Sequence, residues 1–423
     1  MRHAESATSE AWRHRIRRGP PGRGLRPETP GPAGPTERGG GLTVQTGPVT
    51  TSRPAPPPVL SQRTLNRALL ARQHLLQRVE WPAGAMIEHL IGMQSQAPIA
   101  PYVGLWNRVS GFEPGELAGL MLERKAVRAS LMRYTLHLVT ARDYLALRPV
   151  FAPLLARRFR VSAFQRNLVG VDLDELARLG RALLEEQPRT AADLGRGLAE
   201  HWPGRDRLSL SAALGPLLPL VQVPPRGVWG ASGLPTWGLA EAWLGLPVGS
   251  DSSPDDVVLR YLGAFGPASV ADIQNWSGLA RLGPIVDRLR DRLVTFRDER
   301  QRELFDLPDA PRPDPATPAP ARFLPEYDNL LLGHRDRTRV MNVEHSTPLF
   351  PGNGGVLGSV LLDGRFAGGW RIRRTADRAV LEVALVAAAL GPDRQDLEQE
   401  GQRLLAFAAG DRSRRDVVIG PQG

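Results

Sequence analysis

Cysteine is absent from the 423 residues of the sequence, which excludes disulfide bonds, thiolate metal ligands and cysteine nucleophiles. The longest strongly apolar run, residues 379–391, is interrupted by Glu382 and is too short to span a bilayer. The arginine-containing N-terminus continues into proline and glycine instead of an apolar segment, so the pattern does not predict a secretory signal peptide. A cytoplasmic protein without membrane contact is the expectation.

Several sequence motifs of enzyme sites are also missing. The eight histidines include no His-x-x-x-His pair, and Leu357 occupies the position where a dinucleotide-binding G-x-G-x-x-G motif requires its third glycine. There is no Walker loop and no G-x-S-x-G nucleophile elbow. We therefore expect neither a metal ion nor a cofactor.

Lysine is nearly absent as well, because Lys125 is the single lysine among 54 basic residues. Residues 1–58 hold nine arginines and four glutamates, so half of the formal charge of +10 lies there. This segment is rich in proline and glycine and is predicted to be disordered. It is either a basic arm that holds DNA or a mis-assigned start upstream of Val59, and its composition favours the second. The remainder is mildly basic, which is compatible with nucleic acid.

From Ser61 onward the pattern becomes helical. Ser61 is a suitable N-cap, and leucines spaced by three and four predict a helix that reaches Leu76. Three more helices are expected at residues 83–93, 103–109 and 114–124. Residues 127–140 follow, and their alternation in the second half predicts a β-hairpin. Helices followed by a two-stranded wing are typical of a winged helix.

The same order of elements recurs twice. Capping boxes start at Thr190 and Ser269, each between two further helices and each followed by a strand pair. The second strand pair covers residues 293–297 and 303–307. The sequence thus predicts a mainly α fold with β wings (α+β), built of three tandem winged-helix motifs.

A proline-rich linker and a small β-rich module complete the expected fold. Strands are predicted at residues 356–362, 364–373 and 379–386, followed by a helix at 395–409. The predicted divisions are a tail (1–58), three winged helices (59–165, 166–250 and 251–310), a linker (311–321) and the C-terminal module (322–423).

One short stretch, residues 93–98, is unusually polar for the end of an apolar helix. Pro98 disfavours helical backbone before it, so the helix should end near Met93 or Gln94 and continue as extended chain. Residues two apart then share a side, which would let Gln94 and Gln96 converge on one pocket. The alternative is that the two amides only satisfy helix-end carbonyl groups.

Around this stretch the sequence resembles the AlkZ-type winged-helix DNA glycosylases. The resemblance extends over about residues 59–410 and is carried by segments 60–73, 92–98, 102–106, 132–139, 143–144, 265–268, 276–278, 324–328 and 368–370. It implies three tandem winged helices with a β-rich C-terminal part. It also implies excision of N-alkylated purines and unhooking of nitrogen-linked interstrand crosslinks, with Gln94 and Gln96 as the catalytic pair. Ser95 departs from the family, which has an aliphatic residue there, and should turn a packing contact into a hydrogen bond.

The expected activity is a monofunctional hydrolysis of the N-glycosidic bond of cationic N-alkylated purines, in monoadducts and in crosslinks. An alkylated purine is already a good leaving group, so amides that orient water and stabilise an oxocarbenium-like state suffice. The implied partner is double-stranded DNA carrying alkylated purines, bound by a monomer that associates with the nucleoid. The alternative is a non-catalytic winged-helix DNA-binding protein or regulator.

Further DNA contacts are expected from five residues on the predicted wings: Arg133, His137, Arg297, Arg300 and Arg302. Each has a plainer alternative: a solvated arginine for Arg133, a satisfied core histidine for His137, and a hairpin paired through Glu299 and Glu303 for the other three. Tyr327 and Asp328 either brace the site or form an Asx turn. Trp106, Trp276 and Trp370 are expected in the core.

Overall fold

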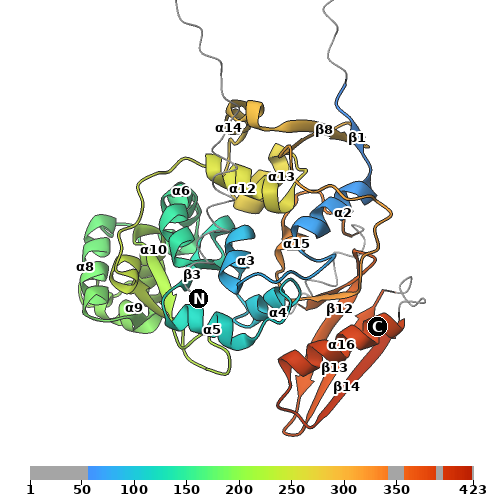
Figure 1. Cartoon of the computed structure of the whole chain (residues 1–423). Coiled ribbons are helices and arrows are strands. Elements are labelled where there is room, and N and C mark those ends of the chain that lie inside the picture. Colours follow the sequence, from blue (N-terminus) through green and yellow to red (C-terminus); the bar gives the residue numbers. More distant parts are fainter. Residues whose placement is uncertain (1–55, 342–356, 387–393, 422–423) are drawn as a thin grey trace, which may run out of the picture. The chain divides into compact units, whose positions relative to one another are not determined.

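The computed structural model describes residues 56–341, 357–386 and 394–421. From Pro57 onward the chain forms one compact unit, in which helices and β-sheets are mixed (Figure 1). Nearly all of the predicted tail and the start of the strand predicted from residue 356 lie outside the described residues. Within those residues, none of the helices combines the length and apolarity needed to cross a membrane.

Four helices open the folded part, in the regions where the sequence predicts them. They are α2 (Gln62–Arg72), α3 (Ala83–His89), α4 (Ala100–Trp106) and α5 (Pro114–Leu122). Ser61 caps α2 as predicted, because its Oγ accepts a hydrogen bond from the backbone N–H of Thr64 at 3.1 Å. The helix ends at Arg72 and not at Leu76, since His74 has a φ of +51° that interrupts helical backbone.

The first two predicted hairpins belong to one six-stranded sheet. The strands follow the order β2-β4-β3-β6-β7-β5. Their bounds are β2 (Met93–Gln94), β3 (Ala126–Ser130), β4 (Leu136–Thr140), β5 (Arg189–Thr190), β6 (Leu220–Val223) and β7 (Thr236–Leu239). Arg128 on β3 pairs with Gln222 on β6, where the two hairpins meet. The sheet therefore continues across the predicted boundary between residues 165 and 166.

Six helices occupy the middle of the chain. They are α6 (Ala141–Arg160), α7 (Ala163–Arg166), α8 (Leu173–Glu186), α9 (Ala191–Ala199), α10 (Arg207–Leu217) and α11 (Ala240–Leu244). Thr190 caps α9 as predicted, since its Oγ1 accepts from the N–H of Asp193 at 3.2 Å. α6 is an additional helix beyond those predicted, and its interior contains Pro149 and Pro153. Leucines of α8, α9 and α10 form a core of their own.

The third set of helices precedes a three-stranded sheet. The helices are α12 (Asp255–Phe265), α13 (Val270–Ser277) and α14 (Gly283–Arg288). The strands are β1 (Val59–Leu60), β8 (Val294–Asp298) and β9 (Glu303–Asp306), in the order β1-β8-β9. The predicted capping box at Ser269 and Asp272 is confirmed, with both reciprocal hydrogen bonds present. β1 brings the start of the folded chain alongside this predicted wing.

The proline-rich segment, residues 308–320, is bound along α2 and is called the proline strap here. Its backbone carbonyls accept from arginines of that helix: Pro315 from Arg63 at 2.7 Å, Thr317 from Arg67 at 2.7 Å, and Pro311 from Arg72 at 3.2 Å. The predicted proline-rich linker thus lies against α2. The segment contains turns at residues 308–309 and 315–316, and the arginines of α2 fix it to the helix.

The C-terminal part is a five-stranded sheet covered by one helix. Its strands are β10 (Arg322–Leu324), β11 (Gly358–Leu362), β12 (Arg365–Arg374), β13 (Arg378–Leu385) and β14 (Arg414–Pro421), in chain order across the sheet. The short α15 (Asn329–Leu332) follows β10, and α16 (Arg394–Ala408) lies across the sheet (Figure 1). The prediction of three strands and a helix is confirmed, but β10 and β14 were missed. The fold is thus mixed α+β.

Candidate active site

A left-handed turn places the two glutamines. α3 ends at His89, earlier than the predicted Met93 or Gln94, because Ile91 and Gly92 have φ values of +57° and +94°. Gly92 cannot carry a side chain here, since a Cβ would lie 2.5 Å from Cγ1 of Val139 and 2.9 Å from the carbonyl oxygen of Leu138. The chain then pairs with β4 as β2, with Gln94 opposite His137. The turn, not Pro98, therefore ends the helix.

The two amides meet as predicted, but Gln96 is not among the residues that line the pocket beside Gln94. Nε2 of Gln94 donates a hydrogen bond to Oε1 of Gln96 at 2.5 Å. Gln94 is 7% exposed whereas Gln96 is exposed. One amide is thus anchored in the protein, and the other presents its remaining hydrogen-bonding capacity to solvent.

Ser95 is fully buried between the two glutamines and makes the hydrogen bond that the sequence analysis predicted. Its Oγ accepts from Nε of Arg128 at 2.9 Å, and its carbonyl oxygen accepts from Nη2 of the same residue at 2.6 Å. Arg128 also donates through Nη1 to Oε1 of Gln222 at 2.8 Å. Desolvation, aided by the nearby Arg226, lowers the pKa of Arg128 to about 10. The guanidinium of Arg128 therefore holds the backbone and side chain of Ser95 in place, and its acceptors on Ser95 and Gln222 are neutral.

Arg133 lies beside Gln94, on a turn between β3 and β4 and not on a strand as predicted. Its φ is +56°, and this kink directs Nη2 to Oε1 of Gln94 at 2.6 Å. Nη1 donates to the carbonyl oxygen of Trp276 at 2.5 Å. Burial, followed by repulsion from Arg337, lowers the pKa of Arg133 to about 10. The plainer alternative of a solvated arginine is wrong, since Arg133 is part of the glutamine site.

His137 is fully buried beneath this site. Its Nδ1 faces the carbonyl oxygen of Thr135 at 3.0 Å and must donate to it, so Nε2 carries the lone pair that faces Nη2 of Arg133 at 3.4 Å. Desolvation and the charge of Arg133 lower the pKa of His137 to about 3. The expected DNA contact is incompatible with this burial, and His137 is the satisfied core histidine of the alternative interpretation.

A small pocket adjoins Gln94 on its other side. Residues 325–329 line it together with Met93, Gln94 and Arg108. Asp328 forms a buried ion pair with Arg108 at 2.8 Å, and Asn329 donates through Nδ2 to the carbonyl oxygen of Gly92 at 2.8 Å. Asp328 also accepts from the backbone N–H of Leu330 at 2.9 Å, which is the Asx turn of the alternative interpretation, so this residue both forms the turn and is bound to the pocket residue Arg108.

Comparison with known proteins identifies the family at this point. A family model described as DNA glycosylase AlkZ-like matches residues 87–407. The chain belongs to the AlkZ-like DNA glycosylases. It is therefore an enzyme that acts on DNA, and the matched segment includes both glutamines and the pocket.

A solved structure shows the same fold. The Streptomyces sahachiroi DNA glycosylase AlkZ aligns with a TM-score of 0.70 and 22% sequence identity, over 86% of this chain and 100% of that chain. No curated protein matches this chain by sequence. At this identity the likeness supports the fold, while the family model supports the activity.

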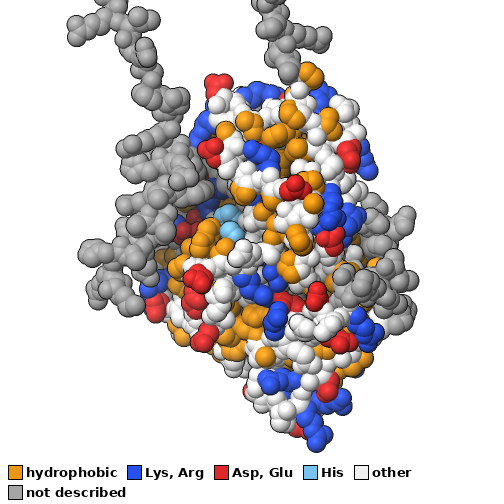
Figure 2. Space-filling view, turned by 45° about the vertical axis from the view of Figure 1, so that its right-hand side comes forward, with side chains coloured by type: hydrophobic (Ala, Val, Ile, Leu, Met, Phe, Trp, Pro, Cys, Tyr) orange, Lys and Arg blue, Asp and Glu red, His pale blue; other side chains and the backbone are white. Residues whose placement is uncertain are grey.

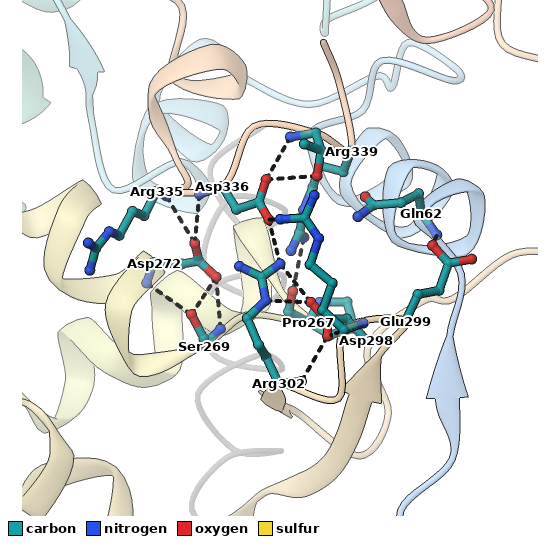
Figure 3. Close-up of polar contacts among 12 residues, drawn as sticks. Gln62, Pro267, Ser269, Asp272, Asp298, Glu299, Arg302, Arg335, Asp336 and Arg339 are labelled. Carbon is teal, nitrogen blue, oxygen red and sulfur yellow. Dashed lines mark hydrogen bonds and ion pairs between the residues drawn. The ribbon is translucent and has the colours of Figure 1, made fainter. Parts of the chain in front are cut away.

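The other predicted DNA contacts of this DNA glycosylase lie on the β8–β9 hairpin, in a different sheet from Gln94. Nε of Arg302 donates to Asp298 at 2.6 Å, and its guanidinium also pairs with Asp336 (Figure 3). Arg300 lies 3.4 Å from Asp336, and Arg297 donates to the carbonyl oxygen of Gln301 at 3.3 Å. All three arginines are exposed. The hairpin is thus an ion-paired one, although Asp298 and Asp336 supply the acceptors in place of Glu299 and Glu303.

Basic and acidic side chains also alternate on the molecular surface. On the face drawn in Figure 2, arginines lie beside acidic residues instead of forming one continuous basic patch. This agrees with the mild net charge of residues outside the tail. Positive charge on this face is therefore interspersed with negative charge.

Some residues of the site escaped the sequence analysis. Arg128, Arg108, Asn329 and Glu326 were not singled out, although residues 324–328 carried part of the family resemblance. Their signal was weak because each becomes significant only through partners that are distant in sequence. Of the tryptophans expected in the core, Trp276 and Trp370 are buried, and Trp106 is partly buried against Phe407.

Proposed function

We propose that the enzyme is a monofunctional DNA glycosylase that hydrolyses the N-glycosidic bond of cationic N-alkylated purines. Gln94 and Gln96 are the proposed catalytic residues. The observation that carries the proposal is the direct hydrogen bond between their amides, one buried and one exposed. Two carboxamides in this arrangement suit a substrate that already carries a positive charge and needs little acid catalysis.

The hydrogen bonds run in one direction and suggest separate roles. Arg133 donates to the carbonyl of Gln94, and the amide of Gln94 donates to the carbonyl of Gln96. Hydrogen bonds in such a chain polarise one another. Oε1 of Gln96 keeps a second lone pair, which accepts a proton of the attacking water and faces the positive charge that develops on the sugar. Gln94 positions this acceptor.

The proposed substrate is double-stranded DNA, bound by a monomer. The recurring order of helices followed by a hairpin supports the interpretation as three winged helices, with Arg297, Arg300 and Arg302 on the third wing as phosphate contacts. Because these arginines already have acceptors, binding of phosphate there would exchange carboxylates for phosphate oxygens. Interstrand crosslinks joined through purine nitrogens carry the same cationic base and are the second proposed substrate.

Release of N7-methylguanine tests the proposal. Wild-type enzyme should convert a duplex with this lesion into abasic sites, scored as alkali-labile strand breaks, and Gln94→Ala/Gln96→Ala should lose this activity at least about 100-fold. A crosslinked duplex forms a second arm. The proposal fails if the wild type releases no more base than the double variant from either substrate, while both bind DNA equally.

A further inference from the structure

The pocket beside Gln94 contains a carboxylate that the proposed roles do not use. Its cavity volume is about 10 Å³, which is room for about one water molecule and far below the about 300–1,000 Å³ of typical ligand pockets. A purine base does not fit comfortably in such a space, but water does. Glu326 lines this pocket together with Gln94.

The loop that carries Glu326 is rigidly attached to the glutamine turn. On its C-terminal side, Asp328 is bound to Arg108 by two hydrogen bonds of 2.8 and 2.9 Å and caps α15. Asn329 binds the carbonyl of Gly92, two residues before Gln94. Tyr327, between Glu326 and Asp328, has a φ of +62°. The loop that follows Glu326 is therefore fixed to the glutamine turn by buried contacts.

The carboxylate of Glu326 is unusual in a chain so rich in arginine. In the part of the chain that the structure describes, neither arginine nor lysine forms an ion pair with it. Its pKa is raised by burial, and the hydrogen bond from its own backbone N–H offsets this only in part. The other ionisable groups of the pocket are Arg108 and Asp328, which pair with each other, and Tyr327.

Hydrolysis leaves one proton that the glutamines cannot take, because a carboxamide has no useful basicity. We infer that Glu326 is the general base, which accepts a proton from the attacking water where this pocket meets the hydrogen-bonded pair of Gln94 and Gln96. The inference rests on the proposed function above. A carboxylate whose pKa is shifted toward the working pH is the better base for this step.

The step balances as follows. The oxygen of water forms a bond to C1′ of the sugar while the bond from C1′ to N9 of the purine breaks. The electron pair of that bond stays on N9 and neutralises the cationic base, which leaves as a neutral alkylpurine. One proton of the water passes to the carboxylate of Glu326, and the other remains on the new C1′ hydroxyl of the abasic site.

Single-turnover base release by Glu326→Gln tests the assignment, with the N7-methylguanine duplex as substrate between pH 5 and pH 8. The wild-type rate should rise with pH on the acid side as Glu326 loses its proton and then level off. Glu326→Gln should be about 10²–10⁴-fold slower and should lack this rise, while its affinity for the duplex stays unchanged. Glu185→Gln, at an exposed position on α8, is the matched control and should behave as wild type.

A second variant separates catalysis from folding. Glu326→Ala should regain part of its rate in formate, because formate supplies a carboxylate to the space that the side chain leaves. If the wild type is active but Glu326→Gln matches its rate and its pH profile, Glu326 is not the base. The same holds if formate leaves Glu326→Ala unchanged. Absence of base release by the wild type would instead overturn the proposed function.

Discussion

At the scale of single residues, the glutamine site depends on two arginines that donate hydrogen bonds to uncharged acceptors of the motif. Arg128 and Arg133 are both directed at the glutamine motif, and each donates there to carbonyl, amide or hydroxyl acceptors. A buried donor left without an acceptor costs the free energy of its desolvation. The positions of the glutamines are therefore tied to the satisfaction of these two guanidiniums.

Ser95→Ala should lower the free energy of unfolding by about 1–3 kcal/mol, because Nε of the buried Arg128 loses its acceptor. Urea unfolding followed by circular dichroism measures this. Ser110→Ala removes a hydroxyl from an exposed position and should change stability by less than about 0.5 kcal/mol. Equal stability of Ser95→Ala and wild type would show that Oγ of Ser95 contributes nothing.

At the scale of elements, the first helix is attached to the third wing by a buried ion pair. Nη1 and Nη2 of Arg72 on α2 bind the two carboxylate oxygens of Asp306 on β9 at 2.6 and 2.8 Å, and both side chains are fully buried. Arg312, within the proline strap, also pairs with Asp306. This cluster connects segments that the sequence analysis placed in different modules.

Asp306→Ala should destabilise the enzyme by about 3–5 kcal/mol, because it leaves the charge of Arg72 buried without a carboxylate. The double variant Arg72→Met/Asp306→Leu should recover most of this loss, since it removes both charges. Thermal and urea unfolding give the comparison, with exposed Asp309→Ala as the control. A double variant as unstable as the single one would contradict this explanation.

Elements were predictable where local chemistry determines them. The caps at Ser61 and Ser269, the hairpins and the side shared by Gln94 and Gln96 follow from spacing and side-chain type. The end of α3 was not, because Ile91 is a β-branched residue in left-handed backbone, which local preference disfavours. Arg133 was predicted on a strand, because the alternating pattern of residues 135–139 gave no sign of its left-handed backbone. In both cases tertiary contacts around Gly92 and Trp276 override the local preference.

At the scale of the whole molecule, four histidines are neutral near pH 7, of which His137 and His334 are buried and His74 and His89 are partly buried. The pKa values of His74 and His137 are both lowered to about 3, chiefly by desolvation, and those of His89 and His334 are lowered as well. In the unfolded chain these groups titrate near 6.5. Below that pH the unfolded chain binds protons and the folded protein does not. The contribution of these histidines to the free energy of unfolding is therefore fully present above about pH 6.5 and is lost as the pH decreases toward 3.

The free energy of unfolding should thus fall between pH 7.5 and pH 5.5 by about 1 kcal/mol for each such histidine. Urea unfolding at the two pH values measures the total. His137→Asn should show a smaller fall than wild type, because one titrating group is gone, whatever its stability at pH 7.5. A fall of the same size in the variant would mean that His137 is protonated in the folded enzyme.

The junction of β3 and β6 determines where this chain can be divided. Truncation after residue 165, at the end of the first predicted winged helix, would expose the edge of β3 and remove Gln222 from Arg128, and with it one fixed support of the glutamine motif. Sheet edges without a partner promote aggregation. Fragments made to isolate the catalytic motif should therefore extend beyond β7, and exchange of the motif between relatives should carry β6 with it.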